Sequence, residues 1–193
     1  YEMSASLVGS EMCIRDSTYT AFLKDHNITD ENAAPAAGQA IRLDSGMLAA
    51  GEGKFTAGTD SVLLDEEGSL TVAFQGQPGL YNLVIEYDPV AGRSRDVELG
   101  VRLGGKLPFQ EAGSLVLTRR WRDKGGKIET DLNGNDIRPS QEEITKEERD
   151  WLTYTAEDSS GFHTRALLFP IEAENTLTLY CLLYTSDAAD DGE

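Results

Sequence analysis

Hydrophobic and polar residues alternate with a period of two along much of the chain between residues 39 and 180. The clearest stretch is 97–103, where every second side chain is apolar and the residues between are Glu, Gly and Arg. A strand with this pattern has one face on a core and one toward water, which is typical of antiparallel sheets. The same alternation predicts further strands at 70–74, 81–87, 115–117 and 177–179.

Turn signals separate these predicted strands. Gly and Pro cluster between them, as in Gln-Pro-Gly at 77–79 and Gly-Gly at 104–105 and 125–126. Such residues favour the backbone conformations of tight turns. Many short strands separated by turns are typical of a β-sandwich or barrel. We therefore predict an all-β fold, an antiparallel jelly-roll-like sandwich with one or two short helices.

Two segments have helical signals. Side chains three and four positions apart share one face of a helix. This spacing occurs near the amino-terminal end, at Tyr19, Phe22, Leu23 and His26. Farther along the chain, Ser140 is followed three residues later by Glu143, the pattern of a capping box. That pair predicts a short helix over 141–150.

The two ends of the chain differ from its interior. The segments SLVGSEMCIRDS and CLLYTSDAADD, one near each end, resemble translations of sequencing-adapter DNA. We therefore expect 1–17 and 181–193 to be disordered artefacts, because segments of this kind take no part in folding. Between them we expect a short helix and linker over 18–38 and one β-sandwich domain over 39–180. An interior of this length is large enough to bury its own core.

Composition limits the partners of the chain. Both cysteines, Cys13 and Cys181, lie in the terminal segments, so no disulfide is expected within the interior. The chain has 34 acidic and 17 basic residues, a net charge of −17. Removing the seven acids and one base of the terminal segments leaves 27 acids and 16 bases, a net charge of −11. Because binding phosphates requires an excess of Lys and Arg, this acidity argues against nucleic acid. No run approaches the ~20 apolar residues of a membrane span.

Catalytic signatures are missing from the interior. Its histidines are His26 and His163, and neither has a spaced acidic partner for a zinc site. It has no cysteine and no Gly-x-Ser-x-Gly motif, so no nucleophile stands out. Carboxylates are numerous enough to supply a glycosidase pair, but the sequence singles out none. We therefore expect a non-catalytic protein that requires no cofactor.

Three stretches of the interior carry a family resemblance. GLYNLVIEY (79–87) and DVELGVRLGGK (96–106) resemble the middle of a galactose-binding-like jelly roll. There a Gly-aromatic pair opens one strand, and a later strand ends in a Gly-Lys turn. EAENTLTL (172–179) resembles a late strand of the same superfamily. Its best-known members are carbohydrate-binding modules, so the resemblance implies contact with a carbohydrate.

A second resemblance covers nearly all of 18–180. YTAFL (19–23) and RRWRD…DLNGNDIRPSQ (119–141) resemble parts of the amino-terminal β-sandwich region of large extracellular solute-binding proteins of gut bacteria. This resemblance implies an extracellular or cell-surface location and an adjacent solute-binding domain in the same polypeptide. The module then contacts glycan or, alternatively, serves as a scaffold packed against that domain. A third alternative is an accessory or catalytic fragment of a glycan hydrolase.

Aromatic side chains are the first candidates for glycan contact. A ring can lie against the apolar face of a pyranose while Asn and Asp bind its hydroxyls. The interior has two tryptophans, and polar residues that could bind hydroxyls lie between them in the sequence. The alternative for these rings is core packing or the cover of a sheet edge. The candidate set is Trp121, Asn133, Asn135, Asp136, Trp151 and Tyr154.

Residues 131–142 match a calcium-binding loop in part. Four oxygen-bearing residues stand at positions 1, 3, 5 and 12 of the template, but Asp136 stands at position 6, where the sharp turn requires Gly. The alternative is a turn in which Asn and Asp side chains bond to the backbone. The galactose-binding-like resemblance implies a structural calcium near the first strand. Asp131 is therefore a metal candidate from the loop pattern, and Asp44 and Glu172 are candidates that the resemblance implies.

Basic residues concentrate in one short segment of this acidic chain. Five of the 16 interior bases lie within 119–127. Such a segment can receive a carboxylate or an acidic neighbouring domain. The alternative is a solvated strand and turn.

Overall fold

The computed structural model describes residues 17–29, 35, 40–53, 55–65, 67–90 and 94–182. Apart from Ser17, Cys181 and Leu182, the two terminal segments expected to be artefacts lie outside these ranges, as does much of the expected linker. Within the described ranges the chain is mostly β, its sheets are antiparallel, and it has one short α-helix. These features confirm the predicted fold class.

The strands predicted from alternation all form. The helix is α2 (Tyr19–Asp25), and the two 3-10 turns are η1 (Ser45–Met47) and η2 (Gln110–Gly113). The strands are β1 (Leu48–Glu52), β2 (Phe55–Ala57), β3 (Val62–Leu64), β4 (Ser69–Gln75), β5 (Gly79–Asn82), β6 (Val84–Tyr87), β7 (Val97–Leu103), β8 (Leu115–Leu117), β9 (Trp121–Asp123), β10 (Glu129–Thr130), β11 (Asp136–Ile137), β12 (Gln141–Glu143), β13 (Leu152–Thr155), β14 (Leu168–Ile171) and β15 (Glu174–Cys181).

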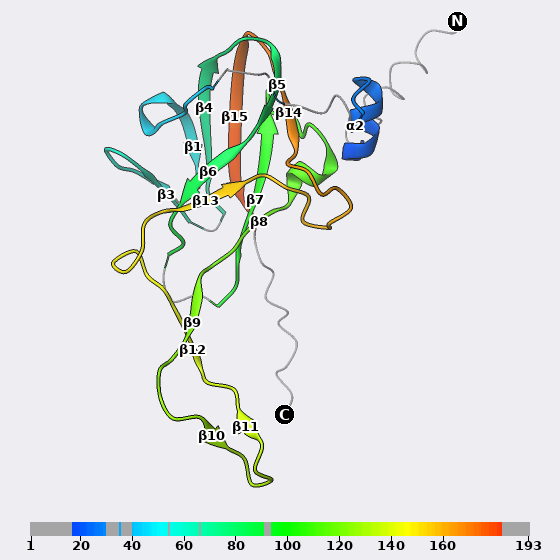
Figure 1. Ribbon diagram of the computed structural model, residues 1–193. Coiled ribbons are helices and arrows are strands. Elements are labelled where there is room, and N and C mark those ends of the chain that lie inside the picture. Colours follow the sequence, from blue (N-terminus) through cyan, green and yellow to red (C-terminus); the bar gives the residue numbers. More distant parts are fainter. Residues whose placement is uncertain are drawn as a thin grey trace, which may run out of the picture.

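The largest sheet has five strands in the order β1-β4-β15-β7-β8 (Figure 1). Its central strand, β15, is antiparallel to both neighbours. Leu177 of β15 lies opposite Val72 of β4 on one side and Leu103 of β7 on the other. The pairing continues to the end of the described chain, where the Leu182 N–H donates to the Glu98 carbonyl at 3.1 Å.

A second layer lies across one face of this sheet and consists of two strand pairs, β5–β14 and β6–β13 (Figure 1). Residues 81–87, predicted as one strand, divide at Leu83 because β5 pairs with β14 whereas β6 pairs with β13. At the division, the Ala156 N–H donates to the Leu83 carbonyl, and the Leu167 N–H donates to the Ala156 carbonyl, both at 2.8 Å. Residues 157–166 therefore leave the layer and return to it at one point. We call them the pocket loop.

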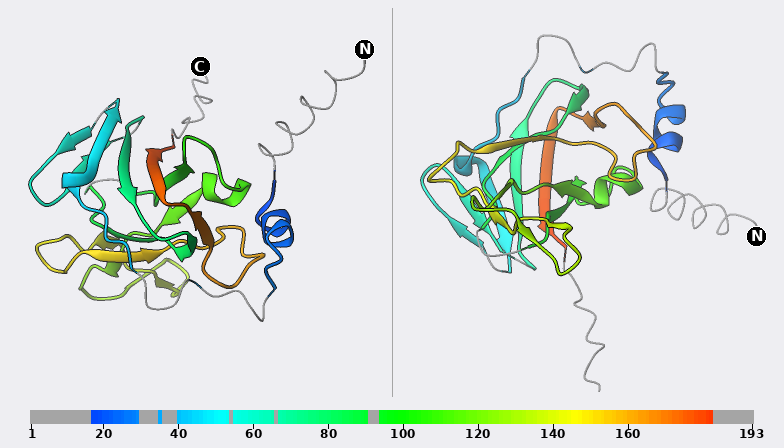
Figure 2. Two further views of the ribbon diagram at one scale, coloured as in Figure 1. Left: turned by 90° about the horizontal axis from the view of Figure 1, so that it is seen from above. Right: turned by 60° about the horizontal axis from the view of Figure 1, so that its bottom comes forward.

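The core combines side chains from both layers with the buried face of α2. Phe109, Leu115 and Leu167 are among its fully buried residues. Tyr19 and Phe22 of α2 contact the Phe109 ring, with centroids 4.7 and 5.2 Å apart. Fully burying a side chain of this size contributes about 1.5–3 kcal/mol. The helix predicted near the amino-terminal end is thus an integral part of the core, and Figure 2 shows it beside the pocket loop.

After β8 the chain leaves the two layers as a long hairpin, which we call the arm (residues 120–141). Its inner part pairs β9 with β12, and its outer part pairs β10 with β11 (Figure 1). Every residue of the arm is exposed. We call the rest of the described chain the body.

The helix predicted over 141–150 is wrong, because Gln141–Glu143 forms strand β12 and pairs with β9. The segment has a single apolar residue besides polar and charged ones, Ile144, so it offers no apolar face that a helix could bury. Glu143, expected to cap that helix, instead forms an ion pair with Arg119.

Candidate functional site

The base of the arm is built around the buried guanidinium of Arg119. Its Nε donates to the Arg95 carbonyl at 2.6 Å, and its Nη1 donates to the Val90 carbonyl at 2.8 Å. The same Nη1 lies 2.8 Å from Glu143 Oε1, and the two side chains are 3% and 9% exposed. Because Arg119 precedes the arm and Glu143 ends β12, this pair joins the two strands where they leave the body.

Burying this ion pair costs free energy, because both charges lose their hydration. Charges removed from water need both an opposite charge and hydrogen bonds to offset the loss of hydration. Arg119 has them, whereas Glu143 Oε2 is buried with no hydrogen-bond partner among the described residues. A second, partly buried pair joins Arg149 Nη2 to Asp88 Oδ1 at 2.9 Å. The chain that returns from the arm is therefore held to the body by two ion pairs.

The inner part of the arm is held by exposed polar pairs to β12 and to the segment that follows it. Arg122 lies 2.8 Å from both Glu142 and Glu148, and hydrogen bonds to these carboxylates raise the pKa of its guanidinium. Gln141 donates to Asp123 at 3.1 Å. Exposed pairs of this kind are screened by water and contribute little to stability.

The tip of the arm is a turn organised by Asp131. Its Oδ1 accepts the backbone N–H groups of Asn133 and Asn135, both at 2.8 Å, and its Oδ2 accepts the Asn135 side-chain amide at 3.0 Å. The bond from the Asn135 side chain, and then those from the backbone, lower the pKa of Asp131. Gly134 supplies the positive φ of 81° that the turn requires. This is the side-chain-to-backbone geometry of an Asx turn.

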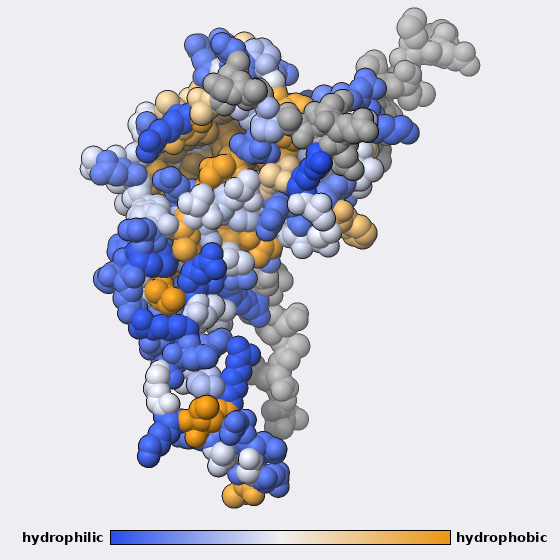
Figure 3. Space-filling view, viewed as in Figure 1, coloured by the Kyte–Doolittle hydropathy of each residue, from blue (hydrophilic) through white to orange (hydrophobic). Residues whose placement is uncertain are grey.

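Apolar side chains are exposed along this polar hairpin. Leu132 at the tip is fully exposed, and Ile128, directly before β10, and Ile137, in β11, each have more than a third of their surface in water. Trp121, at the inner end, is 38% exposed. Figure 3 shows hydrophobic residues interrupting the mainly hydrophilic surface of the arm. A two-stranded hairpin has no second layer, so it cannot bury these side chains by itself.

The structure divides the candidate glycan residues among three places. Asn133, Asn135 and Asp136 lie at the outer end of the arm, and Trp121 lies at its inner end, opposite Glu143. Trp151 precedes β13 and is 51% exposed. Tyr154 belongs to the core, where its hydroxyl is 3.2 Å from the Glu157 nitrogen. Neither indole makes a ring contact within the described part of the chain, and no single sugar ring could touch the whole set.

The three metal candidates are also separate in the sequence and in their local roles. Asp44 caps η1 by accepting the Gly46 N–H at 2.9 Å. Glu172 lies in the turn between β14 and β15, where its N–H donates to Asn175 Oδ1. Among the residues that the structure describes, no three His, Cys, Asp or Glu side chains are placed to hold one metal ion. Calcium binding stays a prediction.

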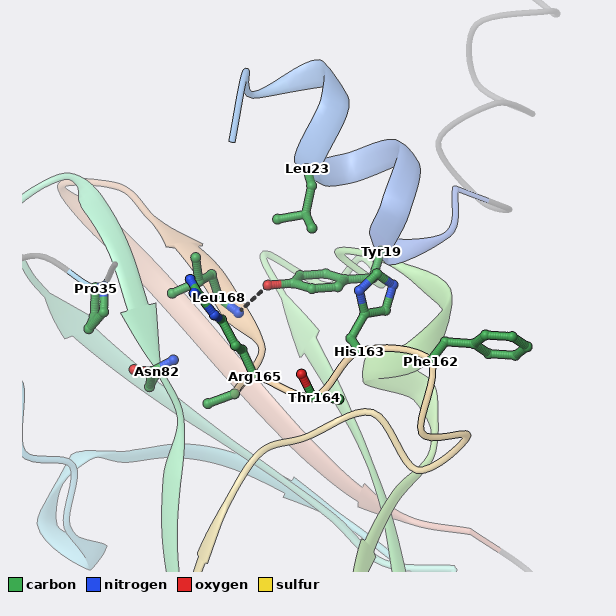
Figure 4. Close-up of a pocket in the computed structure, with 10 residues that line it drawn as sticks. Tyr19, Leu23, Pro35, Asn82, Phe162, His163, Thr164, Arg165 and Leu168 are labelled. Carbon is green, nitrogen blue, oxygen red and sulfur yellow. Dashed lines mark hydrogen bonds between the residues drawn. The ribbon is translucent and has the colours of Figure 1, made fainter. Parts of the chain in front are cut away.

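A cavity of about 240 Å³ lies between α2 and the pocket loop, and no sequence motif pointed to it. Figure 4 shows Arg165 extending from the loop toward the other labelled residues, while Phe162 points away from them. The Leu168 N–H donates to the Tyr19 hydroxyl at 3.0 Å on one wall. The described lining residues are Tyr19, Leu23, Pro35, Asn82, Phe162, His163, Thr164, Arg165, Ala166 and Leu168.

The pocket loop is organised by the buried carboxylate of Asp158. It accepts the Ser160 N–H at 2.9 Å, the Ser160 hydroxyl at 2.6 Å and the His163 N–H at 3.1 Å. Burial acts to raise the pKa of Asp158, but the bonds from Ser160 and His163 outweigh it and hold that pKa below its usual value. The Asp-Ser-Ser sequence at 158–160 is the one local signal that could have indicated this turn.

The loop also contacts α2 directly. The His163 ring stands edge-on to the Tyr19 ring at 4.9 Å, and its Nε2 is 3.1 Å from the Thr20 hydroxyl. Burial raises the pKa of the Tyr19 phenol, the hydrogen bond from Leu168 opposes this effect, and the charge of Glu111 adds to it. Tyr19 is therefore a neutral hydrogen-bonding group of the cavity wall near neutral pH.

Comparison with protein-family models, curated proteins and solved structures finds no match for this chain. In the described ranges, no helix is both long enough and apolar enough to cross a membrane.

Proposed function

We propose that this protein is a non-catalytic β-sandwich module that docks onto a neighbouring protein domain through its arm. The observation that carries the proposal is the exposure of apolar side chains along a hairpin that has no core of its own. An isolated two-stranded hairpin is marginally stable in water. Exposed apolar side chains grouped on one projecting element are typical of an interaction site.

The arm has the chemistry of a protein interface. Trp and Arg are enriched where proteins bind one another, and the arm carries Trp121, Arg120 and Arg122 near its base. Arg120, Lys124 and Lys127 add exposed positive charge to an acidic chain. A partner with surface carboxylates and a shallow apolar groove would complement both properties. The resemblance to extracellular solute-binding proteins favours a neighbouring domain of the same polypeptide as that partner.

Hydrogen exchange tests the proposal. In the longest natural polypeptide that contains residues 18–180, we expect the amides of 128–137 to exchange at least about tenfold more slowly than in the isolated chain. Chemical cross-links from Lys124 and Lys127 should reach a residue outside the body, whereas those from Lys106, an exposed lysine of the body, should not. Equal exchange in both proteins, together with no cross-link from the arm, would contradict docking.

A matched pair of variants gives the side-chain control. Leu132→Ser removes the most exposed apolar side chain of the arm, and Leu63→Ser removes a 54% exposed leucine of the body. The first should restore fast exchange at the arm in the longer polypeptide, and the second should leave it slow. Both side chains face water in the isolated chain, so neither variant should alter its fold.

Glycan contact is the second candidate, and the observation that favours it is the exposure of Trp121 and Trp151. An exposed indole offers a flat apolar face to a pyranose ring. The whole chain, with α2 retained because it completes the core, would be applied to a glycan array. If this candidate is right, Trp151→Ala should abolish binding to the glycans that the unmodified chain binds on the array. Val84→Ala, at another exposed position of the body, is the control and should leave that binding unchanged. An array without hits would leave docking as the better proposal.

A further inference from the structure

The tip of the arm carries a chemically reactive dipeptide. Asn133 is followed by Gly134, and at no other position of the sequence does Gly follow Asn. The backbone nitrogen of the next residue can attack an asparagine side chain, and a glycine nitrogen does so most readily because its residue has no Cβ and a freely turning backbone. We propose that Asn133 is a site of spontaneous deamidation, which converts it to aspartate and isoaspartate.

The reaction needs no enzyme and no reactant besides water. The Gly134 nitrogen loses its proton to a base in solution and forms a bond to Asn133 Cγ. The bond from Cγ to Nδ2 breaks, and Nδ2 takes up a proton and leaves as ammonia, so that a five-membered succinimide ring remains. Water then adds to one of the two ring carbonyl carbons and opens the ring. One opening gives aspartate, and the other gives isoaspartate, in which the chain runs through the side-chain carbons.

The surroundings of Asn133 leave its side chain accessible. Every residue from 131 to 140 is exposed. The Asn133 backbone N–H donates to Asp131, but its side-chain amide makes no hydrogen bond with the described residues. Asn135, in the same exposed tip, differs in two ways. Its side-chain nitrogen donates to Asp131 Oδ2 at 3.0 Å, and the residue that follows it is Asp136 rather than Gly. The tip therefore contains one reactive asparagine and one protected asparagine.

Asp131 controls how readily the Gly134 nitrogen can react. The Gly134 N–H donates to the Asp131 carbonyl at 3.0 Å, so this bond must open before the nitrogen attacks. The Asp131 carboxylate stabilises the same turn by accepting the backbone N–H groups of Asn133 and Asn135, both at 2.8 Å. A solvent-exposed turn with no core beneath it opens locally without unfolding the rest of the protein. The turn therefore slows the reaction, and loss of the Asp131 carboxylate should speed it.

Deamidation changes both the charge and the shape of the arm. Residues 120–141 include five basic and four acidic side chains, a net charge of +1, and conversion of Asn133 adds a fifth acid and makes the arm neutral. Isoaspartate also lengthens the backbone at position 133 by one carbon, which disrupts the bonds that Asp131 accepts across it. Both changes lie next to Leu132 and oppose contact with an acidic partner. This consequence rests on the docking function proposed above, and it makes docking weaken as the protein ages.

Ageing of the whole chain at mildly alkaline pH and body temperature tests the proposal. Peptide mapping by mass spectrometry identifies each converted asparagine, and chromatography separates the aspartate and isoaspartate products. We expect Asn133 to react at least about tenfold faster than Asn135 and Asn175, whose side-chain amides are bonded. Asp131→Ala should increase the rate at Asn133 at least about threefold without changing the melting temperature. The proposal is overturned if Asn133 stays intact while the isolated peptide of 128–138 is converted, or if Asn135 reacts as fast. An unchanged rate in Asp131→Ala would overturn the control assigned to that residue.

Asn133→Gln tests the consequence for docking. It keeps a side-chain amide, but attack on it must close a six-membered ring, so position 133 should stay unconverted over the same period. In the longest natural polypeptide that contains residues 18–180, ageing should make amide exchange at the arm fast in the unmodified protein and leave it slow in Asn133→Gln. Slow exchange that persists after Asn133 has been converted would overturn the effect on docking. Fast exchange from the start would instead contradict docking itself, while the peptide map still decides whether Asn133 deamidates.

Discussion

The body and the arm are held together by different forces. The body buries aromatic and aliphatic side chains between two layers and α2, with Phe109, Leu115 and Leu167 at most 1% exposed. The arm buries nothing between residues 120 and 141 and consists of paired charges, amides and a hydrogen-bonded tip. Burial acts on the whole body cooperatively, whereas exposed pairs are local and screened by water. The stability of the body therefore comes from its buried core, whereas the arm has no core of its own.

Truncating the centre of the core gives the largest expected difference between the two regions. Phe109→Ala should lower the free energy of unfolding by about 3–5 kcal/mol, because it leaves a cavity among Tyr19, Phe22 and Phe169. Leu132→Ala, at the tip of the arm, should change it by less than about 0.5 kcal/mol. Urea unfolding followed by circular dichroism measures both. Similar effects at the two positions would show that the arm belongs to the cooperative unit.

Breaking the ion pair at the base should have the next largest effect. Arg119→Met leaves the Glu143 carboxylate buried and unpaired, and should lower the free energy of unfolding by about 3 kcal/mol. Arg122→Met, at the exposed pair a few residues away, should leave the unfolding curve unchanged. Arg119→Met combined with Glu143→Leu should recover part of the loss, since no unpaired charge remains. If the single and double variants were equally unstable, the pair itself would not be the cause.

Acidification should loosen the pocket loop before it unfolds the core. The pKa of Asp158 is lowered in the folded protein, so its stabilising contribution is complete above the unfolded pKa of about 4 and is lost as pH falls through the lower folded value. Asp158→Asn should cost about 1–2 kcal/mol at pH 7, because the Ser160 and His163 donors lose a charged acceptor. The difference from the unmodified chain, measured by urea unfolding, should be constant above about pH 4 and should shrink as the pH falls further. A constant difference would mean that the Asp158 charge does not contribute.

The smallest expected effect is at the tip of the arm. Asp131→Ala removes the acceptor for the Asn133 and Asn135 amides, so these two amides should exchange with solvent faster. The melting temperature should not change, because the tip makes no contribution to the core. Amide exchange by nuclear magnetic resonance measures the local effect and calorimetry the global one. A lower melting temperature would connect the tip to the stability of the body.

Sequence alone predicted the body better than the arm, for a physical reason. Strands such as β7 and β15 bury one face, and burial imposes the alternation from which they were predicted. The arm buries neither face, so no pattern of apolar residues identifies its strands. The capping-box signal at Ser140 and Glu143 was local and was overridden when Glu143 became the partner of Arg119. Its true role depends on a residue 24 positions away in the sequence.

The candidate sites show the same limit. Neither the residue type nor the spacing of Trp121 and Trp151 showed that they lie outside the core. An isolated tryptophan in a sequence fits both glycan contact and core packing. The cavity escaped prediction because its walls come from α2, β5 and the pocket loop, which are distant along the chain. Arg165 and His163, which line it, belong to no recognised motif.

The two ends of the pocket loop meet at Ala156, and this makes the loop a suitable place for engineering the protein. Because residues 157–166 leave and rejoin the second layer at Leu83, β13 and β14 continue one another along a single partner segment. Residues could be inserted into this excursion, or exchanged for another sequence, without shifting the register of either strand. The scaffold is therefore suited to loop grafting, in which a new recognition surface is installed while the sheets keep their pairing.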